Sequence, residues 1–165
     1  MTRLDSFIRR LEAQRRCLDH AARAVRAVPG PVLELGLGNG RTFDHLRHLL
    51  PGRDIFVFER QVAAHPDCRP DAAHLILGDV RQTLPGALAR IGAPAALAHM
   101  DIGSGDHDAN LALAAWLGPA LRPLLAPGAL VVADQPFAAP GLVPMPLPRG
   151  VDEGRYFLYR ASAAA

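Results

Sequence analysis

The chain has 165 residues, of which 50% are hydrophobic and 21% are charged, and its formal net charge is +2; this predicts one globular, soluble domain and excludes a largely disordered chain. All 18 basic residues are arginine, which excludes reactions that need a lysine, such as Schiff-base formation or phosphate binding by a P-loop. Its two cysteines belong to no metal-binding motif, and no signal peptide or membrane-spanning apolar run is recognisable, so a cytoplasmic protein is expected.

The first predicted element is a helix from Leu4 to about Val28, which Pro29 and Gly30 end. Its apolar residues recur every three or four positions with arginines between them, a pattern typical of an amphipathic helix. We expect this apolar stripe to cover a bound ligand or to pack against a second subunit, and it consists of Leu4, Phe7, Ile8, Leu11, Leu18, Ala22 and Val25.

Short apolar runs and helical patterns then alternate as far as Asp134. The runs have the length of buried strands and are "PVLEL", "DIFVFE", "HLILGD", "AALAHMD" and "GALVVAD". Helical patterns lie between them in "RTFDHLRHLL", "TLPGALARIG" and "DHDANLALAAWLGPALRPLL". This alternation predicts a mostly parallel sheet wrapped by helices, which is the doubly wound α/β architecture.

The chain after Asp134 has a different character. It is rich in proline, so we expect an irregular segment with at most a short edge strand before "RYFLYRA", which alternates like a final strand. The alanines after Ser162 are expected to be disordered. The prediction is therefore a single domain over 1–165, with an N-terminal helix at 1–28, a ligand-binding core at 32–134 and an irregular segment with the final strand at 135–165.

An acidic residue stands at or near the end of each of the five predicted parallel strands. In an open parallel sheet, ligands bind outside the carboxyl ends of the strands, where the strand order reverses. Each acid by itself could simply cap a helix or begin a turn. The whole set points to a ligand site and consists of Glu34, Glu59, Asp79, Asp101 and Asp134.

Three glycines, Gly36, Gly38 and Gly40, follow the first predicted strand and precede a helix that starts at Arg41. Such a loop lets the backbone approach a ligand and offers amides to an anion. Glu59 ends the next strand about twenty residues later, where an acid accepts hydrogen bonds from a ribose diol. The spacing GxGxG, rather than GxGxxG, together with the preceding Glu34, suits a nucleoside ligand that carries an amino-acid tail instead of a pyrophosphate.

These motifs resemble those of class I S-adenosylmethionine-dependent methyltransferases, and of small bacterial members in particular. "ELGLGNG" is similar to the family's first motif, "VFER" to its ribose-binding strand end, "LGDV" to its adenine loop and "LLAPGALVVAD" to the turn into its fifth strand. The resemblance covers about Val32 to Asp134 and implies a Rossmann-like sheet whose last strand is antiparallel. It also implies S-adenosylmethionine as cofactor, bound by Glu34, Gly36, Leu37, Gly38, Gly40, Thr42, Glu59, Arg60, Gly78, Asp79, Val80, Met100, Asp101 and Ile102.

The same resemblance implies individual roles for some of these residues. Glu34 would lie near the amino group of the methionine moiety and Thr42 near its carboxylate. Glu59 would hold the ribose and Asp79 the adenine, while Met100 to Ile102 would border the methionyl end.

The stretch from Met100 to Gln135 has a narrower resemblance, to small-molecule O-methyltransferases that often use a divalent metal. By this similarity Asp101, Asp134 and Gln135 would be ligands of Mg²⁺, which lowers the pKa of a substrate hydroxyl. The match departs from the pattern at Ser104, where catechol-type enzymes carry a lysine, and extra residues separate Asp101 from "GDH". The alternative is that Asp101 touches the cofactor and Asp134 caps a loop, without a metal.

Two residues are candidates for a catalytic role, Asp101 and His107. His107 could serve as a general base because the pKa of an unperturbed histidine lies close to neutrality. The simpler interpretation is that "SGDHD" forms a helix N-terminus whose acids favour the helix dipole. His99 lies inside an apolar strand and is expected to be a hydrogen-bonded core residue.

Together these features predict methyl transfer from S-adenosylmethionine to a small-molecule acceptor, at oxygen. Two alternatives stay open: a methyltransferase-like protein that binds the cofactor without catalysis, and an NAD-dependent oxidoreductase. We expect neither nucleic acid nor a membrane as partner, because the excess of basic residues is small and is not interleaved with aromatic residues. A homodimer through the apolar face of the first helix is compatible with the sequence.

Overall fold

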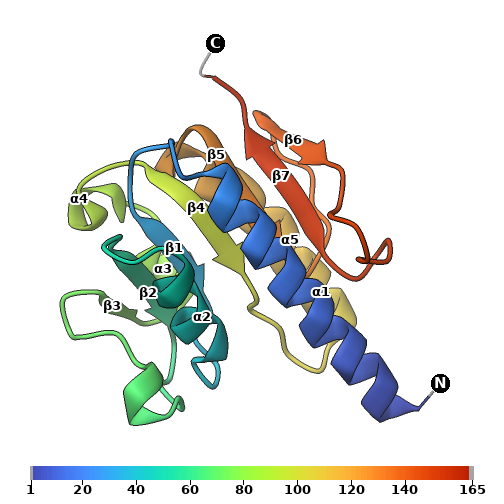
Figure 1. The fold of residues 1–165 in the computed structure, drawn as a ribbon. Helices are drawn as coiled ribbons and strands as arrows, with labels where there is room; N and C mark the ends of the chain where they lie inside the picture. The colour runs from blue at the N-terminus through green and yellow to red at the C-terminus, as the bar shows by residue number, and fades with distance from the viewer. Residues whose placement is uncertain (1, 164–165) are drawn as a thin grey trace.

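The computed structural model describes residues 2–163 and contains a seven-stranded sheet (Figure 1). Its strands are β1 (Val32–Leu35), β2 (Ile55–Glu59), β3 (Leu75–Leu77), β4 (Ala95–Met100), β5 (Leu125–Ala133), β6 (Leu142–Met145) and β7 (Phe157–Ala161). They lie in the order β3-β2-β1-β4-β5-β7-β6. Strands β1 to β5 are parallel, and β7 is antiparallel to both β5 and β6. The predicted mostly parallel sheet with an antiparallel last strand is therefore confirmed.

Helices cover both faces of the sheet, as Figure 1 shows. Residues of α1 (Arg3–Ala24) and α2 (Arg41–Leu49) pack on one face in a core with Val32, Val57 and Leu97. The opposite face packs against α3 (Val80–Thr83), α4 (Leu88–Ile91) and α5 (His107–Leu121). Two short 3-10 turns complete the connections, η1 (Pro66–Cys68) and η2 (Arg122–Leu124). Because successive strand residues point to opposite faces, β1 and β4 each direct alternate side chains toward α1.

Helix α1 differs from its prediction at both ends. It starts at a capping box between Thr2 and Asp5 and ends at Ala24, four residues before the predicted end. Its first two turns project beyond the sheet in Figure 1. Three residues of the predicted apolar stripe are therefore exposed: Leu4 at 66%, Phe7 at 48% and Ile8 at 46%. The stripe is thus divided, because Leu18, Ala22 and Val25 are buried in this chain whereas its first residues are exposed.

The predicted helix in "TLPGALARIG" is also different, because α3 ends at Thr83, the first residue of the stretch, and only the single-turn helix α4 lies within it. Pro85 and Gly86 lie between them, and a proline interrupts helical hydrogen bonding. After β5 the irregular segment and the short strand β6 follow as predicted, and β6 pairs with β7. Of the alanine tail, residues 164–165 lie outside the described residues. Within the described part of the chain, none of the helices has the length and apolar character needed to cross a membrane.

Candidate functional site

One pocket of about 460 Å³ lies at the carboxyl ends of the first four strands. The strand order reverses here, between β1 and β4, and ligands bind at such points in α/β sheets. The expected site residues that line the pocket are Gly36, Gly38, Glu59, Arg60, Gly78, Asp79, Val80, Asp101 and Ile102. Others of the expected set lie outside the lining, namely Glu34, Leu37, Gly40, Thr42, Met100, His107, Asp134 and Gln135.

The three glycines of the loop after β1 have different surroundings. A side-chain carbon on Gly36 would lie 2.5 Å from the carbonyl oxygen of Asp101, so β1 and β4 can approach only if this residue is glycine. A side-chain carbon on Gly40 would collide with the carbonyl oxygen of Cys68. Gly38 has φ +52° and nothing within 4 Å of such a carbon, so it faces open space in the pocket. Two of the glycines thus serve the packing of the chain itself, and Gly38 leaves room for a ligand.

Glu59, at the end of β2, holds the glycine loop. Its Oε2 accepts hydrogen bonds from the amides of Leu37 at 2.8 Å and Gly38 at 3.2 Å, and its Oε1 accepts from Arg60 at 2.7 Å and Gln61 at 3.0 Å. Burial favours the neutral carboxyl, but these four amides outweigh it, so the pKa of Glu59 lies below its usual value. The pocket therefore presents an ionised carboxylate here.

Asp79 follows β3 and caps α3, since its Oδ1 accepts from the amide of Arg81 at 2.8 Å. The guanidinium of Arg81 lies 5.1 Å from the ring centre of Trp116 on α5. Arg81 and Asp79 both line the pocket. The site therefore offers the carboxyl group of Asp79 and the guanidinium group of Arg81 at this end, near β2 and β3.

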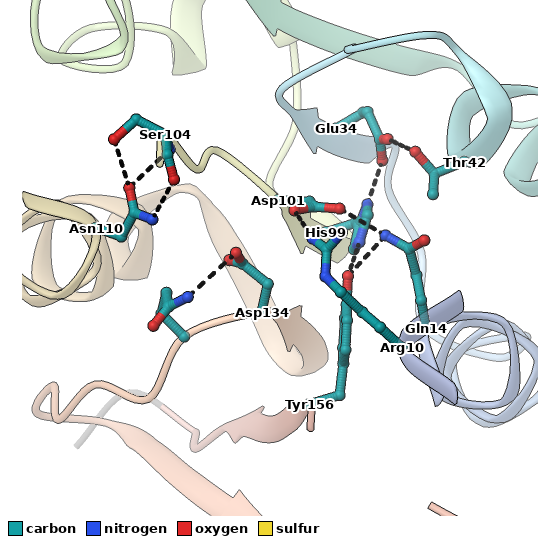
Figure 2. Close-up of polar contacts among 11 residues, drawn as sticks. Arg10, Gln14, Glu34, Thr42, His99, Asp101, Ser104, Asn110, Asp134 and Tyr156 are labelled. Carbon is teal, nitrogen blue, oxygen red and sulfur yellow. Dashed lines mark hydrogen bonds and ion pairs between the residues drawn. The ribbon is translucent and has the colours of Figure 1, made fainter. Parts of the chain in front are cut away.

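A buried polar network lies beneath the pocket between β1, β4 and α1 (Figure 2). Glu34 and His99 face each other across the β1–β4 register and are completely buried, with 2.9 Å between Oε2 and Nδ1. The hydroxyl of Thr42 donates to the other oxygen of Glu34, and Nε2 of His99 lies 3.1 Å from the hydroxyl of Tyr156. Burial alone would lower the pKa of His99, but the charge and hydrogen bond of Glu34 raise it.

His99 is thus a hydrogen-bonded core residue, as its apolar neighbours predict. Its pairing with Glu34 is new information, because spacing along one chain does not reveal which strands are neighbours. The role of Glu34 and Thr42 toward a methionine moiety stays a prediction.

Asp101 lies just beyond β4, and two side chains of α1 contact it (Figure 2). Arg10 donates to its Oδ1 at 2.7 Å, and Gln14 donates to its Oδ2 at 2.7 Å. The same amide nitrogen of Gln14 donates to the hydroxyl of Tyr156 at 2.7 Å. Arg10, Gln14 and Tyr156 belong to none of the motifs that predicted the site. The signal for Gln14 was its place on the core face of the helix, one turn after Arg10 and one turn before Leu18.

The arrangement of Asp101, Asp134 and Gln135 does not fit the expected magnesium site. Both oxygens of Asp101 already accept hydrogen bonds from Arg10 and Gln14, and the amide nitrogen of Gln135 is directed at Asp134. Among residues 2–163 no group of three or more histidine, cysteine or acidic side chains is placed to hold a metal ion. Burial, and then the charge of Asp101, raises the pKa of Asp134 to about 6.

His107 is the first residue of α5, and its side chain is exposed outside the pocket lining. Asp106 caps this helix by accepting from the amide of Ala109 at 3.0 Å. The structure therefore agrees with a helix N-terminus at "SGDHD" and does not bring His107 into the pocket.

The remaining wall of the pocket is formed by Ile102 and Ser104 of the loop after β4 and by Asn110 and Leu113 of α5. Asn110 Oδ1 accepts from the backbone amide of Ser104 at 2.8 Å and from its hydroxyl at 3.2 Å, and Asn110 Nδ2 donates to the carbonyl of Ser104 at 2.9 Å. These bonds tie the loop to α5, so this wall is held in one arrangement.

The sequence and fold have clear counterparts among known proteins. A sequence model of an S-adenosyl-L-methionine methyltransferase family matches residues 1–161. The chain is similar to a crystal structure of an S-adenosyl-L-methionine methyl transferase from Silicibacter pomeroyi DSS-3, at 49% identity and a TM-score of 0.93, over 98% of this chain and 99% of that one. No curated protein matches the chain in sequence.

A more distant likeness is to the O-methyltransferase TomG from Streptomyces achromogenes in complex with SAM. The identity is 23% and the TM-score is 0.54, over 73% of this chain and 54% of that one. This likeness concerns the fold alone.

Proposed function

The chain belongs to the S-adenosyl-L-methionine methyltransferase family, and from this premise we propose that it methylates a small-molecule acceptor at an oxygen atom. Membership of this family makes the chain a methyltransferase with S-adenosylmethionine as its cofactor. The two other functions that the sequence left open, an NAD-dependent oxidoreductase and a non-catalytic cofactor-binding protein, are therefore not retained.

The fit of the pocket to this cofactor supports specific roles for its residues. Gly38 leaves open space in which a ligand can lie against the loop backbone. Under this proposal Glu59 accepts from the ribose hydroxyls and Asp79 faces the adenine. The methionyl end then lies toward β4, beside Asp101 and Ile102. Because all four lone-pair positions of Glu59 already accept backbone amides, ribose binding must share or displace some of these bonds.

The observation that carries the acceptor proposal is the wall of the pocket between β4 and α5. It combines the apolar side chains of Ile102 and Leu113 with the polar side chains of Ser104 and Asn110. Such a mixed and hydrogen-bonded wall suits a small organic molecule with a hydroxyl group. The similarity of the stretch from Met100 to Gln135 to small-molecule O-methyltransferases favours oxygen as the methylated atom.

The proposed reaction demands little of individual side chains. The cofactor supplies an activated methyl group, and transfer to the acceptor is an in-line displacement that depends mainly on holding the two molecules in contact. The residues of this chain bind and orient the cofactor along β1, β2 and β4. They also exclude water on the side of α1, where Gln14 and Tyr156 are buried.

A panel of acceptors tests the proposal. Release of S-adenosylhomocysteine is measured with matched phenols, aliphatic alcohols, amines and thiols, and with protein and RNA as macromolecular acceptors. We expect turnover with hydroxyl compounds and none with Gly38→Val, whose side chain would fill the open space at the loop. Turnover confined to amines, or to protein or RNA, would contradict the proposed acceptor while leaving the family assignment intact.

A further inference from the structure

We propose that Arg10 of α1 is a specificity-determining residue, which weakens the preference of the pocket for the cationic donor over the neutral product by compensating the charge of Asp101. S-adenosylmethionine carries a positive sulfonium, and S-adenosylhomocysteine does not. A carboxylate in the pocket therefore favours the donor, and a guanidinium paired with that carboxylate reduces this effect. The inference depends on the cofactor class and is independent of which acceptor is methylated.

The geometry of Asp101 places this charge compensation in the pocket. Asp101 lines the pocket and its side chain is 22% exposed, so its charge acts on a ligand bound there. The NH2 group of Arg10 lies 2.7 Å from Oδ1 of Asp101, in the range of charge-assisted hydrogen bonds. Figure 2 shows Arg10 reaching from α1 toward Asp101.

A merely structural role does not explain the contact of Arg10 with Asp101, because Gln14 already provides a structural contact at this place. It already holds the second oxygen of Asp101 and ties α1 to the buried hydroxyl of Tyr156. The side chain of Arg10 is 41% exposed, so it adds little packing, and what it adds to the site is a positive charge. Two further ionisable groups act on the same region, His99 in β4 and Asp134 just beyond the end of β5.

Charge compensation at this place has a consequence for catalysis. When the methyl group leaves, the positive charge of the sulfonium is lost, so an uncompensated carboxylate nearby would stabilise the donor more than the transition state. Binding that is stronger in the ground state does not accelerate the reaction. Arg10 thus allows Asp101 to serve as a polar contact without stabilising the bound cationic donor more than the transition state.

The test is the ratio of two dissociation constants, for S-adenosylhomocysteine and S-adenosylmethionine, measured by calorimetry at low salt without any acceptor. We expect Arg10→Ala to raise this ratio roughly 3- to 10-fold, as for one charge interaction in a partly solvated site. Arg10→Lys should keep the wild-type ratio. Arg15→Ala is the matched control, because Arg15 is exposed on the same helix and its removal changes the net charge equally.

A double variant keeps the inference falsifiable. If the higher ratio in Arg10→Ala reflects an uncompensated Asp101, then adding Asp101→Asn must abolish it. An unchanged ratio in folded Arg10→Ala, or an equal change in Arg15→Ala, would overturn the inference; circular dichroism monitors folding. Wild-type protein that binds neither ligand would overturn it together with the cofactor assignment. Failure to methylate any acceptor would affect only the proposed function, since the ratio needs no turnover.

Discussion

The two ends of the pocket are held in place in opposite ways. At the β2 end, Glu59 accepts hydrogen bonds from backbone amides of its own turn and of the glycine loop, at most 22 residues away in sequence. At the β4 end, side chains of α1 hold Asp101, and these lie 87 and 91 residues away. The first end depends on a local motif, whereas the second depends on how a helix docks on the sheet. Substitution of Glu59 should therefore affect mainly ligand binding, whereas substitutions in the buried network below the second end should affect mainly the stability of the folded chain.

The largest effect is expected in the network below the β4 end. His99→Leu would leave the buried carboxylate of Glu34 without its charged partner, and breaking a buried ion pair costs about 3–5 kcal/mol. We expect a loss of this size in the free energy of unfolding, measured by urea denaturation. The matched control is His45→Leu, which breaks the half-exposed pair with Asp19 and should cost less than about 1 kcal/mol. Equal losses in the two variants would show that the buried pair contributes no more to the free energy of unfolding than the half-exposed pair does.

The second effect concerns the β2 end. Glu59→Ala would leave the amides of Leu37 and Gly38 without their acceptor and would remove the proposed ribose contact. Lost hydrogen bonds to a charged group cost about 1.5–3 kcal/mol, so the affinity for S-adenosylhomocysteine should fall roughly 10- to 100-fold. Calorimetric titration measures the affinity, and the control is Glu12→Ala, because Glu12 is an exposed residue of α1. Unchanged affinity in Glu59→Ala would remove Glu59 from the proposed ribose site.

The β2 end and the β4 end of the pocket also differ in how far their structure was predictable from the sequence. Hydrophobic periodicity indicated all five parallel strands, and the glycine loop and Glu59 were identifiable because they lie within one strand-helix-strand unit. The contacts of Asp101 were not identifiable, because no pattern along the chain states which face of α1 meets the end of β4. For the same reason the sequence pattern does not show that α1 extends past the sheet, which leaves Leu4, Phe7 and Ile8 exposed.

The third effect depends on pH and is specific to the β4 end. Because the pKa of Asp134 is raised to about 6 in the folded chain, folding is favoured below the unfolded value of 3.8, and this advantage is lost as the pH rises through about 6. Asp134→Asn should therefore raise the free energy of unfolding at pH 8 by about 1–2 kcal/mol and by much less at pH 4.5. Urea denaturation at both values measures the difference. An equal effect at the two values would refute an origin in the ionisation of Asp134.

Glu59 should respond to pH with the opposite sign. Its pKa is lowered in the folded chain, so its contribution to stability is present above the unfolded value of 4.5 and is lost as the pH falls through the folded value. The wild-type chain should therefore lose more stability than Glu59→Gln on acidification below pH 4.5. The matched comparison is Glu12→Gln, which should follow the wild type.

The smallest effect is expected at Gln14, which joins the two networks. Gln14→Leu would remove its bonds to Asp101 and Tyr156, but Arg10 would still pair with Asp101 and His99 would still lie beside Tyr156. Because each group keeps a partner, we expect a loss of only about 1 kcal/mol in the free energy of unfolding. The control is Gln82→Leu, because Gln82 is an exposed helical residue. The affinity for S-adenosylhomocysteine should change less than about threefold, since Arg10 keeps Asp101 in place and compensated. A loss as large as that of His99→Leu would mean that α1 and the buried pair form one cooperative unit, and the β4 end would then depend on Gln14 rather than on Arg10.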